Sequence, residues 1–308
     1  MRIRAEHLSY TYNAASPFAS RALKDISLTV EEGEFFGIIG HTGSGKSTFV
    51  QHLNGLLRVP SSLKKYKPKK PKKGQVLPPQ TVLTVGRFDL TDKKTDFRAL
   101  RSCVGMVFQY PEYQLFAETV KEDVAFGFKN FAKEKPTEEQ IETAVREALE
   151  IVGLSYDEVK DASPFDLSGG QKRRVAIAGV IVTRPEVLVL DEPAAGLDPL
   201  GKQEIMDVLH RLHQTWCKTV IIVSHDMDEI SENCTNAAVF SEGEVKFVAP
   251  PAQLFRHAEE LVSLGLDIPL TAKLCLALRR NEVEVDCDFT TEDFIRRTLA
   301  LKRGEGNA

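Results

Sequence analysis

The chain has 308 residues, near the length expected for two domains, and 42% of them are apolar, enough for a substantial core. Its formal net charge is −4, from 44 acidic and 40 basic residues, so the overall charge does not favour nucleic acid as the main partner. The five cysteines are scattered without C-x-x-C spacing, which is typical of a reducing compartment and indicates neither a disulfide framework nor a zinc site.

No apolar run approaches the roughly 20 residues that a membrane-spanning helix needs. The opening "MRIRAEHLSY" alternates apolar and polar residues, which predicts a first strand, and it has no signal-peptide core. We therefore expect a soluble protein that reaches a membrane only through a partner.

The first 110 residues contain strands and turns that lead into one strong helix start. "EFFGIIG" is a short apolar run that predicts a buried strand ending at Gly40. A glycine-rich turn and the predicted helix "KSTFVQHLNGLL" follow it.

This turn, "GHTGSGKST" at residues 40–48, satisfies the phosphate-loop pattern G-x-x-x-x-G-K-[ST] in the strand–turn–helix context that the pattern requires. Gly43 and Gly45 allow the backbone to curl so that several N–H groups face the phosphates. Lys46 brings a positive charge to the β- and γ-oxygens, and the Ser47 hydroxyl can reach Mg²⁺. The predicted nucleotide-binding residues of the loop are Gly40, His41, Thr42, Gly43, Ser44, Gly45, Lys46, Ser47 and Thr48.

A phosphate loop does not identify the nucleotide base. No N/T-K-x-D guanine-reading motif is present, which disfavours a GTPase. Tyr12, in "SYTYNAASPF", is a candidate face on which adenine could stack. An ordinary strand aromatic is the other interpretation of Tyr12, and Tyr10 is the competing candidate.

Residues 61–79, "SSLKKYKPKKPKKGQVLPP", contain seven lysines, four prolines and no acidic residue. Such a stretch cannot pack a core, so an exposed, mobile loop between two strands is the simplest interpretation. Attraction to anionic lipid headgroups is a sharper alternative, at about 1 kcal/mol per cation near the surface. Nucleic acid is a weaker third one, because Tyr66 is the single aromatic interleaved for stacking.

Residues 111 to about 180 are predicted to be mainly helical. Thr119 with Glu122 and Thr137 with Gln140 each fit a capping box. An apolar stripe follows the second box, and Gly153 can close that helix. The stripe consists of Ile141, Ala144, Val145, Ala148, Leu149 and Val152.

The stretch "DLSGGQKRR", residues 166–174, places a serine, two glycines and an amide where a helix begins. Unpaired N–H groups and the positive end of the helix dipole suit such a terminus to anions. The chain thus carries a second candidate phosphate cradle, and the residues alone leave open whose phosphate it holds.

From about residue 181 the sequence alternates buried strands with helices. "EVLVLDEP" and "TVIIVSH" predict strands and "GKQEIMDVLHRLHQ" predicts the helix between them, a pattern typical of a parallel sheet covered on both faces. Asp191 and Glu192 end the first of these strands, beside the phosphate loop. Asp191 then suits Mg²⁺, directly or through water, and Glu192 can accept a proton from an attacking water.

The pattern changes again from about residue 246. Leu270, Leu274 and Leu278 stand at i, i+4 spacing, and "TTEDFIRRTLA" has a capped helix start. We expect a small extra domain or extension here, not a continuation of the sheet.

With "LSGGQ" at residues 167–171, the chain resembles an ATP-binding cassette (ABC) ATPase over roughly residues 1–245. Six motifs stand in family order: the phosphate loop, Gln109 in "VFQYPE", the "LSGGQ" helix, "VLVLDEP", "GLDP" with Asp198, and "SHD" with His225. None departs from the pattern of a hydrolytically competent subunit.

The resemblance implies an α/β fold: a P-loop NTPase (RecA-like) core with a mainly parallel sheet, an inserted α-helical subdomain and a small C-terminal α/β extension. Residues 1–110 and 181–245 would form the ATP-binding core. Residues 111–180 would form the helical signature subdomain, and residues 246–308 a C-terminal dimerisation extension.

The resemblance also implies a site shared by two subunits packed head to tail. The signature residues of one subunit would close over the γ-phosphate held by the other; they are Ser168, Gly169, Gly170 and Gln171. Asp198 would lie at the dimer seam, His225 would contact the γ-phosphate, and Gln109 would join Mg²⁺ to movements of the helical subdomain. The expected catalytic residues are Glu192, His225 and Gln109, and the expected metal-binding residues are Ser47, Gln109 and Asp191, with ATP and Mg²⁺ as cofactors.

Translation-type ABC proteins usually carry two cassettes per chain, and this chain has one. Chromosome-type members contain long coiled coils, and no sustained heptad pattern occurs here. A transporter subunit is therefore favoured. "FQYPEYQLFAETVKEDVAFG" is similar to the ATPases of energy-coupling factor (ECF) transporters, and its aromatic–Pro–Glu version resembles the second of their two paralogous ATPases. The tail "LGLDIPLTAKLCLAL" resembles theirs too, whereas the lysine-rich insertion is not expected throughout the family.

This second resemblance implies a peripheral protein at the cytoplasmic face of the cell membrane that pairs with a paralogous ATPase. The pair would drive a transmembrane coupling subunit, which works with small membrane proteins that capture vitamins or metal ions. The coupling subunit would dock in a groove beside Tyr110, Pro111, Glu112, Tyr113, Gln114 and Leu115. No nucleic-acid partner is expected. The alternatives are an ATPase of another ABC transporter class and a soluble ABC ATPase that acts on nucleic acid.

Overall fold

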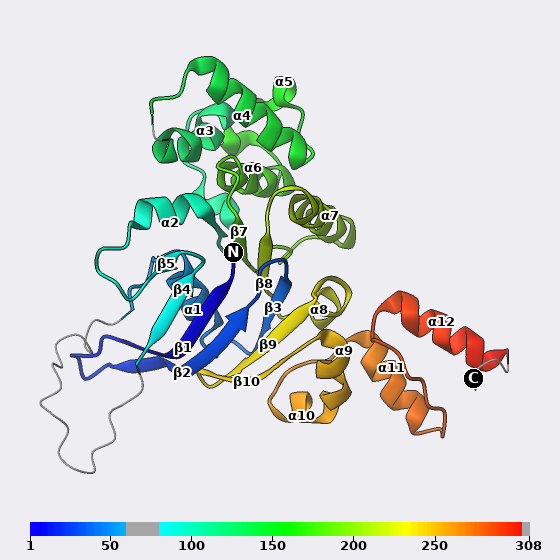
Figure 1. Ribbon diagram of the computed structural model, residues 1–308. Helices are drawn as coiled ribbons and strands as arrows, with labels where there is room; N and C mark the ends of the chain where they lie inside the picture. The colour runs from blue at the N-terminus through cyan, green and yellow to red at the C-terminus, as the bar shows by residue number, and fades with distance from the viewer. Residues whose placement is uncertain (60–79, 133, 304–308) are drawn as a thin grey trace, which may run out of the picture.

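The computed structural model describes residues 1–59, 80–132 and 134–303. A core of two sheets carries a group of helices at one end and the C-terminal helices at another (Figure 1). The predictions for the lysine-rich stretch 61–79 lie outside the described residues.

A six-stranded sheet forms the centre of the core, in the order β10-β9-β3-β8-β7-β6. Its neighbouring strands are parallel from β9 to β6, and β10 pairs antiparallel with β9, so the predicted mainly parallel sheet is confirmed. All residues of β3 and β8 are buried, as expected for apolar strands covered on both faces. The strands are β3 (Phe35–Ile39), β6 (Val104–Val107), β7 (Val187–Asp191), β8 (Thr219–Val223), β9 (Asn236–Ser241) and β10 (Glu244–Ala249).

The strand order brings three loops together at one edge of this sheet. β8 lies between β3 and β7, and all three run in the same direction, so the loops that follow them leave the same edge. The phosphate loop follows β3 and leads into α1 (Lys46–Leu53). Glu192 follows β7 and precedes α7 (Pro199–Thr215), and His225 follows β8 and precedes α8 (Met227–Asn233).

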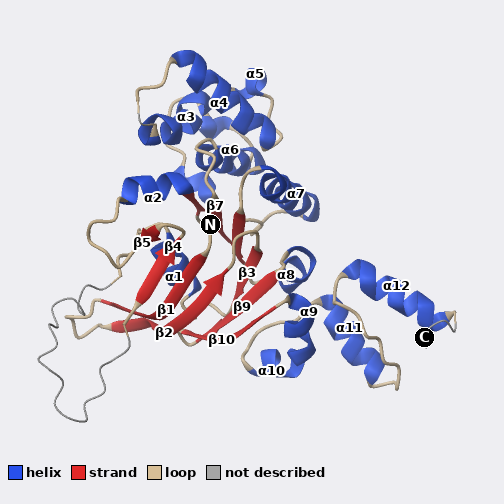
Figure 2. Cartoon of the chain, in the orientation of Figure 1, coloured by secondary structure: helices blue, strands red, loops and turns tan. Residues whose placement is uncertain are grey.

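A second, four-stranded sheet has the antiparallel order β2-β1-β4-β5. The alternating N-terminus predicted its first strand, but the β1–β2 pairing contains register shifts that disturb a simple alternation. Helix α1 packs between the two sheets, because its apolar residues share one buried cluster with residues of both (Figure 2). The strands are β1 (Ile3–Tyr12), β2 (Ser20–Val30), β4 (Val82–Val85) and β5 (Phe88–Asp89).

The predicted helical region is helical in the structure. Thr137 and Gln140 form the complete capping box at the start of α4, as predicted. At α3 only half of the predicted box forms: Thr119 accepts a hydrogen bond from the Glu122 N–H. The elements are α2 (Phe97–Cys103) before β6, and then η2 (Pro111–Gln114), α3 (Val120–Phe131), α4 (Glu138–Ile151), α5 (Tyr156–Val159), η3 (Pro164–Asp166) and α6 (Gly169–Ile181).

The C-terminal extension differs from the α/β arrangement that the resemblance implied, because its described residues beyond Ala249 form helices and loops. Val285, Cys287 and Phe289, at every second position before the last helix, bury their side chains in the main core cluster, an alternation typical of a strand. No strand of the described chain pairs with them, so the alternation produces no ladder. The helices are α9 (Pro251–Leu254), η4 (Phe255–His257), α10 (Ala258–Ser263), α11 (Leu270–Arg279) and α12 (Thr291–Lys302).

None of the helices in the described part of the chain has the length and apolar character needed to cross a bilayer.

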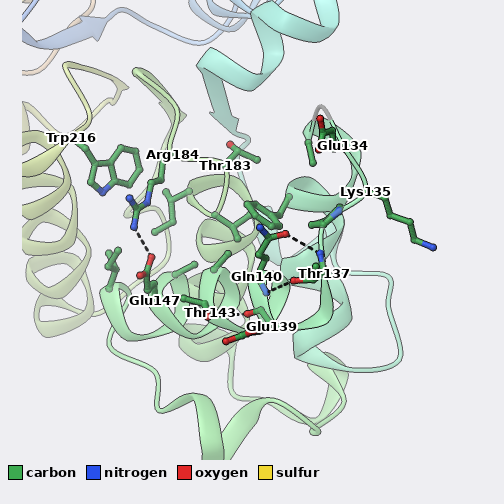
Figure 3. A pocket seen from close by; sticks show the side chains of 18 residues that line it. Glu134, Lys135, Thr137, Glu139, Gln140, Thr143, Glu147, Thr183, Arg184 and Trp216 are labelled. Atoms are coloured by element: carbon green, nitrogen blue, oxygen red, sulfur yellow. Dashed lines mark hydrogen bonds and ion pairs between the residues drawn. The ribbon is translucent and has the colours of Figure 1, made fainter.

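A cavity of about 820 Å³ lies where α3, α4 and α6 meet the end of α7 (Figure 3). Trp216 lines it, and so do Arg184 and Glu147, which form an ion pair of 2.5 Å. No predicted site residue lines this cavity, so it is a junction between the helical region and the core and not the predicted nucleotide site.

Gly40→Ala should destabilise the chain, because a Cβ at this position would lie 2.3 Å from the Phe240 carbonyl oxygen and 2.6 Å from Ser44 Oγ. We expect urea titration to show a loss of about 1–3 kcal/mol in the free energy of unfolding. Gly169→Ala is the matched control, since nothing lies within 4 Å of its added Cβ; its unfolding free energy should stay within ~0.5 kcal/mol of the parent. Equal stability of all three proteins would contradict the close approach at Gly40.

Candidate functional site

The phosphate loop has a backbone conformation that glycine permits. Gly43 and Gly45 have φ values of +81° and +102°, a region that residues with a Cβ rarely adopt. Gly45 is also the N-cap of α1 and offers no side-chain acceptor to the N–H groups of the first turn. A Cβ on Gly43 would meet nothing within 4 Å. The loop therefore presents an open helix N-terminus, which suits a phosphate.

The structure gathers most of the predicted site residues around one cavity of about 750 Å³. The phosphate loop forms one wall, and the residues that follow β7 and β8 face it. The predicted residues that line the cavity are Tyr12, Gly40, His41, Thr42, Gly43, Ser44, Gly45, Lys46, Ser47, Thr48, Gln109, Asp191, Glu192 and His225.

Lys46 folds back over the phosphate loop. Its Nζ donates hydrogen bonds to the carbonyl oxygens of Gly40 (2.6 Å) and His41 (3.0 Å). Burial lowers the pKa of Lys46, and the nearby Glu192 and Asp191 carboxylates act in the opposite direction. The ammonium group is thus held within the loop, where it can exchange carbonyl oxygens for phosphate oxygens.

Ser44 contributes a polar atom without a partner. Its Oγ is buried and makes no hydrogen bond, and the residue lines the cavity. A buried hydroxyl without a partner costs free energy that a ligand oxygen could recover. This observation favours an anionic ligand in the loop.

Asp191, Ser47 and Gln109 bring oxygen donors to the cavity. Burial raises the pKa of the Asp191 carboxyl, although the nearby Ser47 hydroxyl acts to lower it. Hydroxyl, carboxylate and amide oxygens are the donors that Mg²⁺ prefers. No group of three or more His, Cys, Asp or Glu residues in the described ranges could hold a metal alone. The donor set therefore fits a Mg²⁺ ion that arrives with phosphate oxygens, not a metal in an all-protein cage.

Glu192 and His225 contact each other across the loops that follow β7 and β8. The distance from His225 Nδ1 to Glu192 Oε2 is 2.7 Å, and the two side chains are 72% and 13% exposed, respectively. Glu192 has a φ of +55°, in the left-handed region, while its N–H donates to the Val223 carbonyl at 2.8 Å. Backbone strain of this kind is concentrated at functional sites, and Glu192 lines the cavity.

The loop that carries His225 is held on both sides of the histidine. Ser224 Oγ donates to the Glu229 carboxylate and accepts the Asp226 N–H at 3.1 Å. Asp226 also pairs with Lys202 on α7 at 2.8 Å. The position of His225 therefore depends on contacts with α7 and α8.

The structure separates the two tyrosines that competed for the adenine position. Tyr12 lines the cavity, and its hydroxyl lies 3.2 Å from Thr48 Oγ1. Tyr10 instead packs edge-on against Tyr12 and His52. Tyr12 therefore has the access to the cavity that base stacking requires.

Three further residues of the cavity wall were missed by the sequence analysis. Ser20, Arg21 and Ala22 lie at the start of β2 and line the cavity beside Tyr12. They arrive there because Ser20 pairs with Tyr12 across the two strands. Their position on the cavity wall follows from the pairing of β1 with β2, and no local sequence motif predicts it.

The signature residues and Asp198 do not reach this cavity within one chain. Ser168 is the N-cap of α6 and forms a capping box with Gln171. Ser168 and Gly169 are exposed. Asp198 accepts the Gly201 N–H at 2.7 Å and caps α7. Ser168 and Asp198 therefore cap helices, and Ser168 and Gly169 lie on the surface, away from the cavity of their own chain.

An aromatic surface lies beside Gln109. Tyr113 is 84% exposed, and Tyr110, Phe116 and Phe126 are also exposed. The rings pack in pairs, Tyr110 with Tyr113 and Phe116 with Phe126. We call these four side chains, together with η2, which carries Tyr113, the aromatic surface. Exposed aromatic clusters of this kind suit recognition by another protein.

Comparison with known proteins gives consistent similarities. The family model described as "ABC transporter" matches residues 23–195. Proteins named "Energy-coupling factor transporter ATP-binding protein EcfA2" are similar along their length: that of Caldanaerobacter subterraneus subsp. tengcongensis is 44% identical with 100% of both chains covered, and that of Symbiobacterium thermophilum is 46% identical with 99% of each covered.

Two solved structures share the fold with a TM-score of 0.67 each. One is cbiO1 from Clostridium perfringens, described as part of the ABC transporter complex cbiONQ; it is 35% identical, and the match covers 88% of this chain and 97% of that one. The other is the ATP-binding cassette MJ0796, described as a dimeric post-hydrolysis state bound to ADP and Pi; it is 25% identical, with 80% and 98% covered.

Ser44→Ala should weaken ATP binding without destabilising the nucleotide-free chain, because the lost hydroxyl has no partner there. We expect KM for ATP to rise roughly fivefold to tenfold and the free energy of unfolding to stay equal or increase slightly. Ser263→Ala, on the exposed face of α10, is the matched serine control and should change neither quantity. An unchanged KM in Ser44→Ala would contradict a role for this hydroxyl in phosphate binding.

Proposed function

This chain belongs to the ATP-binding proteins of energy-coupling factor transporters, within the ABC transporter family. From that membership we propose a mechanism for its site and a set of partner subunits. It is an ATP-hydrolysing transport subunit. In the proposal it energises the import of vitamins or metal ions through a transmembrane coupling protein. The observation that carries the proposal is the single cavity shared by the phosphate loop, Asp191, Glu192 and His225.

ATP is proposed to lie in this cavity with its adenine on Tyr12 and its phosphates in the loop 40–48. The N–H groups at the start of α1 and the Lys46 ammonium would bind the β- and γ-phosphates. Ser44 would donate its otherwise unpaired hydroxyl. Arg21, on the facing strand, adds a positive charge to the wall beside Tyr12.

The chemistry that Mg²⁺ supplies when bound is neutralisation of the charge on the transferred phosphoryl group. Ser47, Gln109 and Asp191 are the residues proposed to hold it. The shared cavity supports this set, because Ser47, Gln109 and Asp191 all line it.

Glu192 is the proposed general base, which takes a proton from the water that attacks the γ-phosphate. Its carboxylate is mostly buried and is held against His225, which supports a fixed orientation toward the phosphate end of the cavity. His225 is proposed to contact the γ-phosphate and to steady the water once ATP is bound. Gln109 would connect the metal to the helical subdomain.

Catalysis is proposed to need two subunits packed head to tail. Ser168, Gly169, Gly170 and Gln171 of one subunit would close over the γ-phosphate bound by the other, with Asp198 at the seam. The exposure of Ser168 and Gly169, away from the cavity of their own chain, supports this arrangement. The partner is proposed to be a paralogous ATPase. ATP would bridge the two surfaces, and hydrolysis would remove the γ-phosphate contacts so that the pair opens.

The aromatic surface is proposed to receive helices of the transmembrane coupling protein. It lies beside Gln109, which would link docking to the nucleotide site. Small membrane proteins that capture the solute would act through the coupling protein. This assembly would hold the chain at the cytoplasmic face of the cell membrane as a peripheral subunit.

The C-terminal residues 246–308 are proposed to help hold the two ATPases together. Their helices expose apolar side chains that the chain itself does not cover: Leu270 and Leu274 on α11, and Ile295 and Leu299 on α12. In this division residues 1–110 and 181–245 bind ATP, and residues 111–180 supply the signature helix and the docking surface.

Glu192→Gln should keep ATP binding and nearly abolish turnover, because an amide retains the shape of the side chain but cannot accept the proton. We expect kcat for phosphate release to fall at least ~100-fold, KM to change by less than about twofold, and an ATP-bound dimer to accumulate in light scattering. Glu186→Gln, in a half-buried residue just before the other end of β7, is the matched control.

Unchanged steady-state hydrolysis in Glu192→Gln, after removal of contaminating ATPases, would rule out Glu192 as the base. A monomer, verified by mass during turnover, that hydrolyses ATP at the full rate would rule out the shared site.

Replacing Tyr113 and Phe116 together by serine should detach the membrane partner and leave the nucleotide site intact, because both side chains are exposed and neither lines the cavity. Purification from membranes should then yield the chain without the hydrophobic coupling protein, while its KM for ATP stays within about twofold of the parent. Val262→Ser, in an exposed apolar residue of α10, should keep the coupling protein. Retention of the full complement of membrane subunits by the double variant would refute this docking site, and retained nucleic acid in their place would favour the soluble alternative.

A further inference from the structure

Arg173 is a buried arginine with no role in the nucleotide site described above. It lies in the second turn of the signature helix α6, five residues after Ser168, and its side chain is only 4% exposed. It does not line the nucleotide cavity. A buried guanidinium is costly unless every partner is in place, so its contacts indicate what it does.

The Arg173 guanidinium joins two segments that are far apart in the sequence. Nη1 donates to the carbonyl oxygens of Ala195 (2.6 Å) and Pro193 (3.3 Å), in the loop that directly follows Glu192. Nε and Nη2 each donate to one carboxylate oxygen of Glu112, both at 3.4 Å. Glu112 belongs to η2, in the middle of the aromatic surface.

We propose that Arg173 is a positioning residue that links the docking surface to the loop carrying the catalytic glutamate. This inference rests on the proposed function, since it assigns Glu192 to catalysis and η2 to docking. When a partner helix moves η2, Glu112 moves with it. Arg173 must follow or leave a buried charge without its counter-ion, so the displacement reaches Pro193 and Ala195.

The loop after β7 is sensitive to such a displacement. Glu192 itself has a left-handed backbone, with φ +55°, and its carbonyl oxygen accepts a hydrogen bond from the Ala195 N–H at 3.2 Å. A shift of the carbonyl groups at 193 and 195 therefore changes the direction of the carboxylate and its distance from His225. The planar fork of arginine can bind the carboxylate and both carbonyls at once, which the single ammonium of lysine cannot reproduce.

The test compares Arg173→Gln, Arg173→Lys, Glu112→Gln and the Arg173→Gln/Glu112→Gln pair in the full chain, purified with its membrane subunits and also as the ATPase dimer alone. We expect Arg173→Gln to lower kcat roughly tenfold with KM for ATP within about twofold, and Arg173→Lys to recover part of the loss. Glu112→Gln should lower kcat less than Arg173→Gln. The double variant should be no worse than Arg173→Gln, because both changes interrupt one connection.

Arg184→Gln is the matched control, because Arg184 makes an exposed ion pair with Glu147 away from the loop 192–195; its kcat should equal that of the parent. Thermal melting of every variant identifies any loss of folded protein, and kcat is expressed per folded chain. Additive losses in the double variant, a KM that rises in step with the fall in kcat, or an unchanged kcat in Arg173→Gln would each overturn the proposal.

Failure of this link and failure of the proposed function give different results. If Arg173 makes no link, Arg173→Gln hydrolyses ATP like the parent although Glu192→Gln is inactive. If Glu192 is not the base, Glu192→Gln itself stays active. If η2 is not the docking site, the serine double variant of the aromatic surface keeps its membrane subunits while the effect of Arg173→Gln persists in the dimer alone.

Discussion

The parallel order β3–β8–β7 is the constraint on which the site depends. Because the three strands run side by side in one direction, the loops after them meet at a single sheet edge. The phosphate loop precedes Glu192 and His225 by more than a hundred residues in the sequence, yet all three line one cavity. The fully buried strands β3 and β8 make this edge rigid, since their backbone bonds are paired and their side chains are packed on both faces.

The cavity holds charges that burial makes unfavourable. Burial lowers the pKa of Lys46 and raises that of Asp191, so each group is harder to ionise than in water. The unpaired Ser44 hydroxyl adds a further cost. Phosphates accompanied by a divalent cation would satisfy all three groups together. The nucleotide-free site is thus preorganised for such a ligand, and burying these groups without it lowers the free energy of unfolding.

The features that the proposal assigns to partner subunits lie on exposed surfaces of the same chain. Ser168 and Gly169 lie at the exposed start of α6, and the aromatic surface and the apolar residues of α11 and α12 are also open. A chain with so many uncovered apolar and polar features is suited to work within an assembly. In the proposed transporter the start of α6 and the apolar residues of α11 and α12 face the second ATPase, and the aromatic surface faces the coupling protein. The buried Arg173 is the side chain that connects one of them, η2, to the loop after β7.

The sequence alone determined the phosphate loop, the mainly parallel core, the helical region and the residues that meet at the sheet edge, because these follow from local motifs, apolar runs and capping residues such as Thr137. Tertiary structure decided what depends on pairing between distant segments. The β1–β2 register places Tyr12 and Arg21 on the cavity wall, whereas Tyr10 does not line the cavity. The register shifts in that pairing mean that a simple alternation of apolar and polar residues could not predict this arrangement. The alternating residues before α12 form no strand, since a strand needs a neighbour to pair with and the fold supplies none there. The bond between Arg173 and Glu112 joins residues whose proximity no local pattern records.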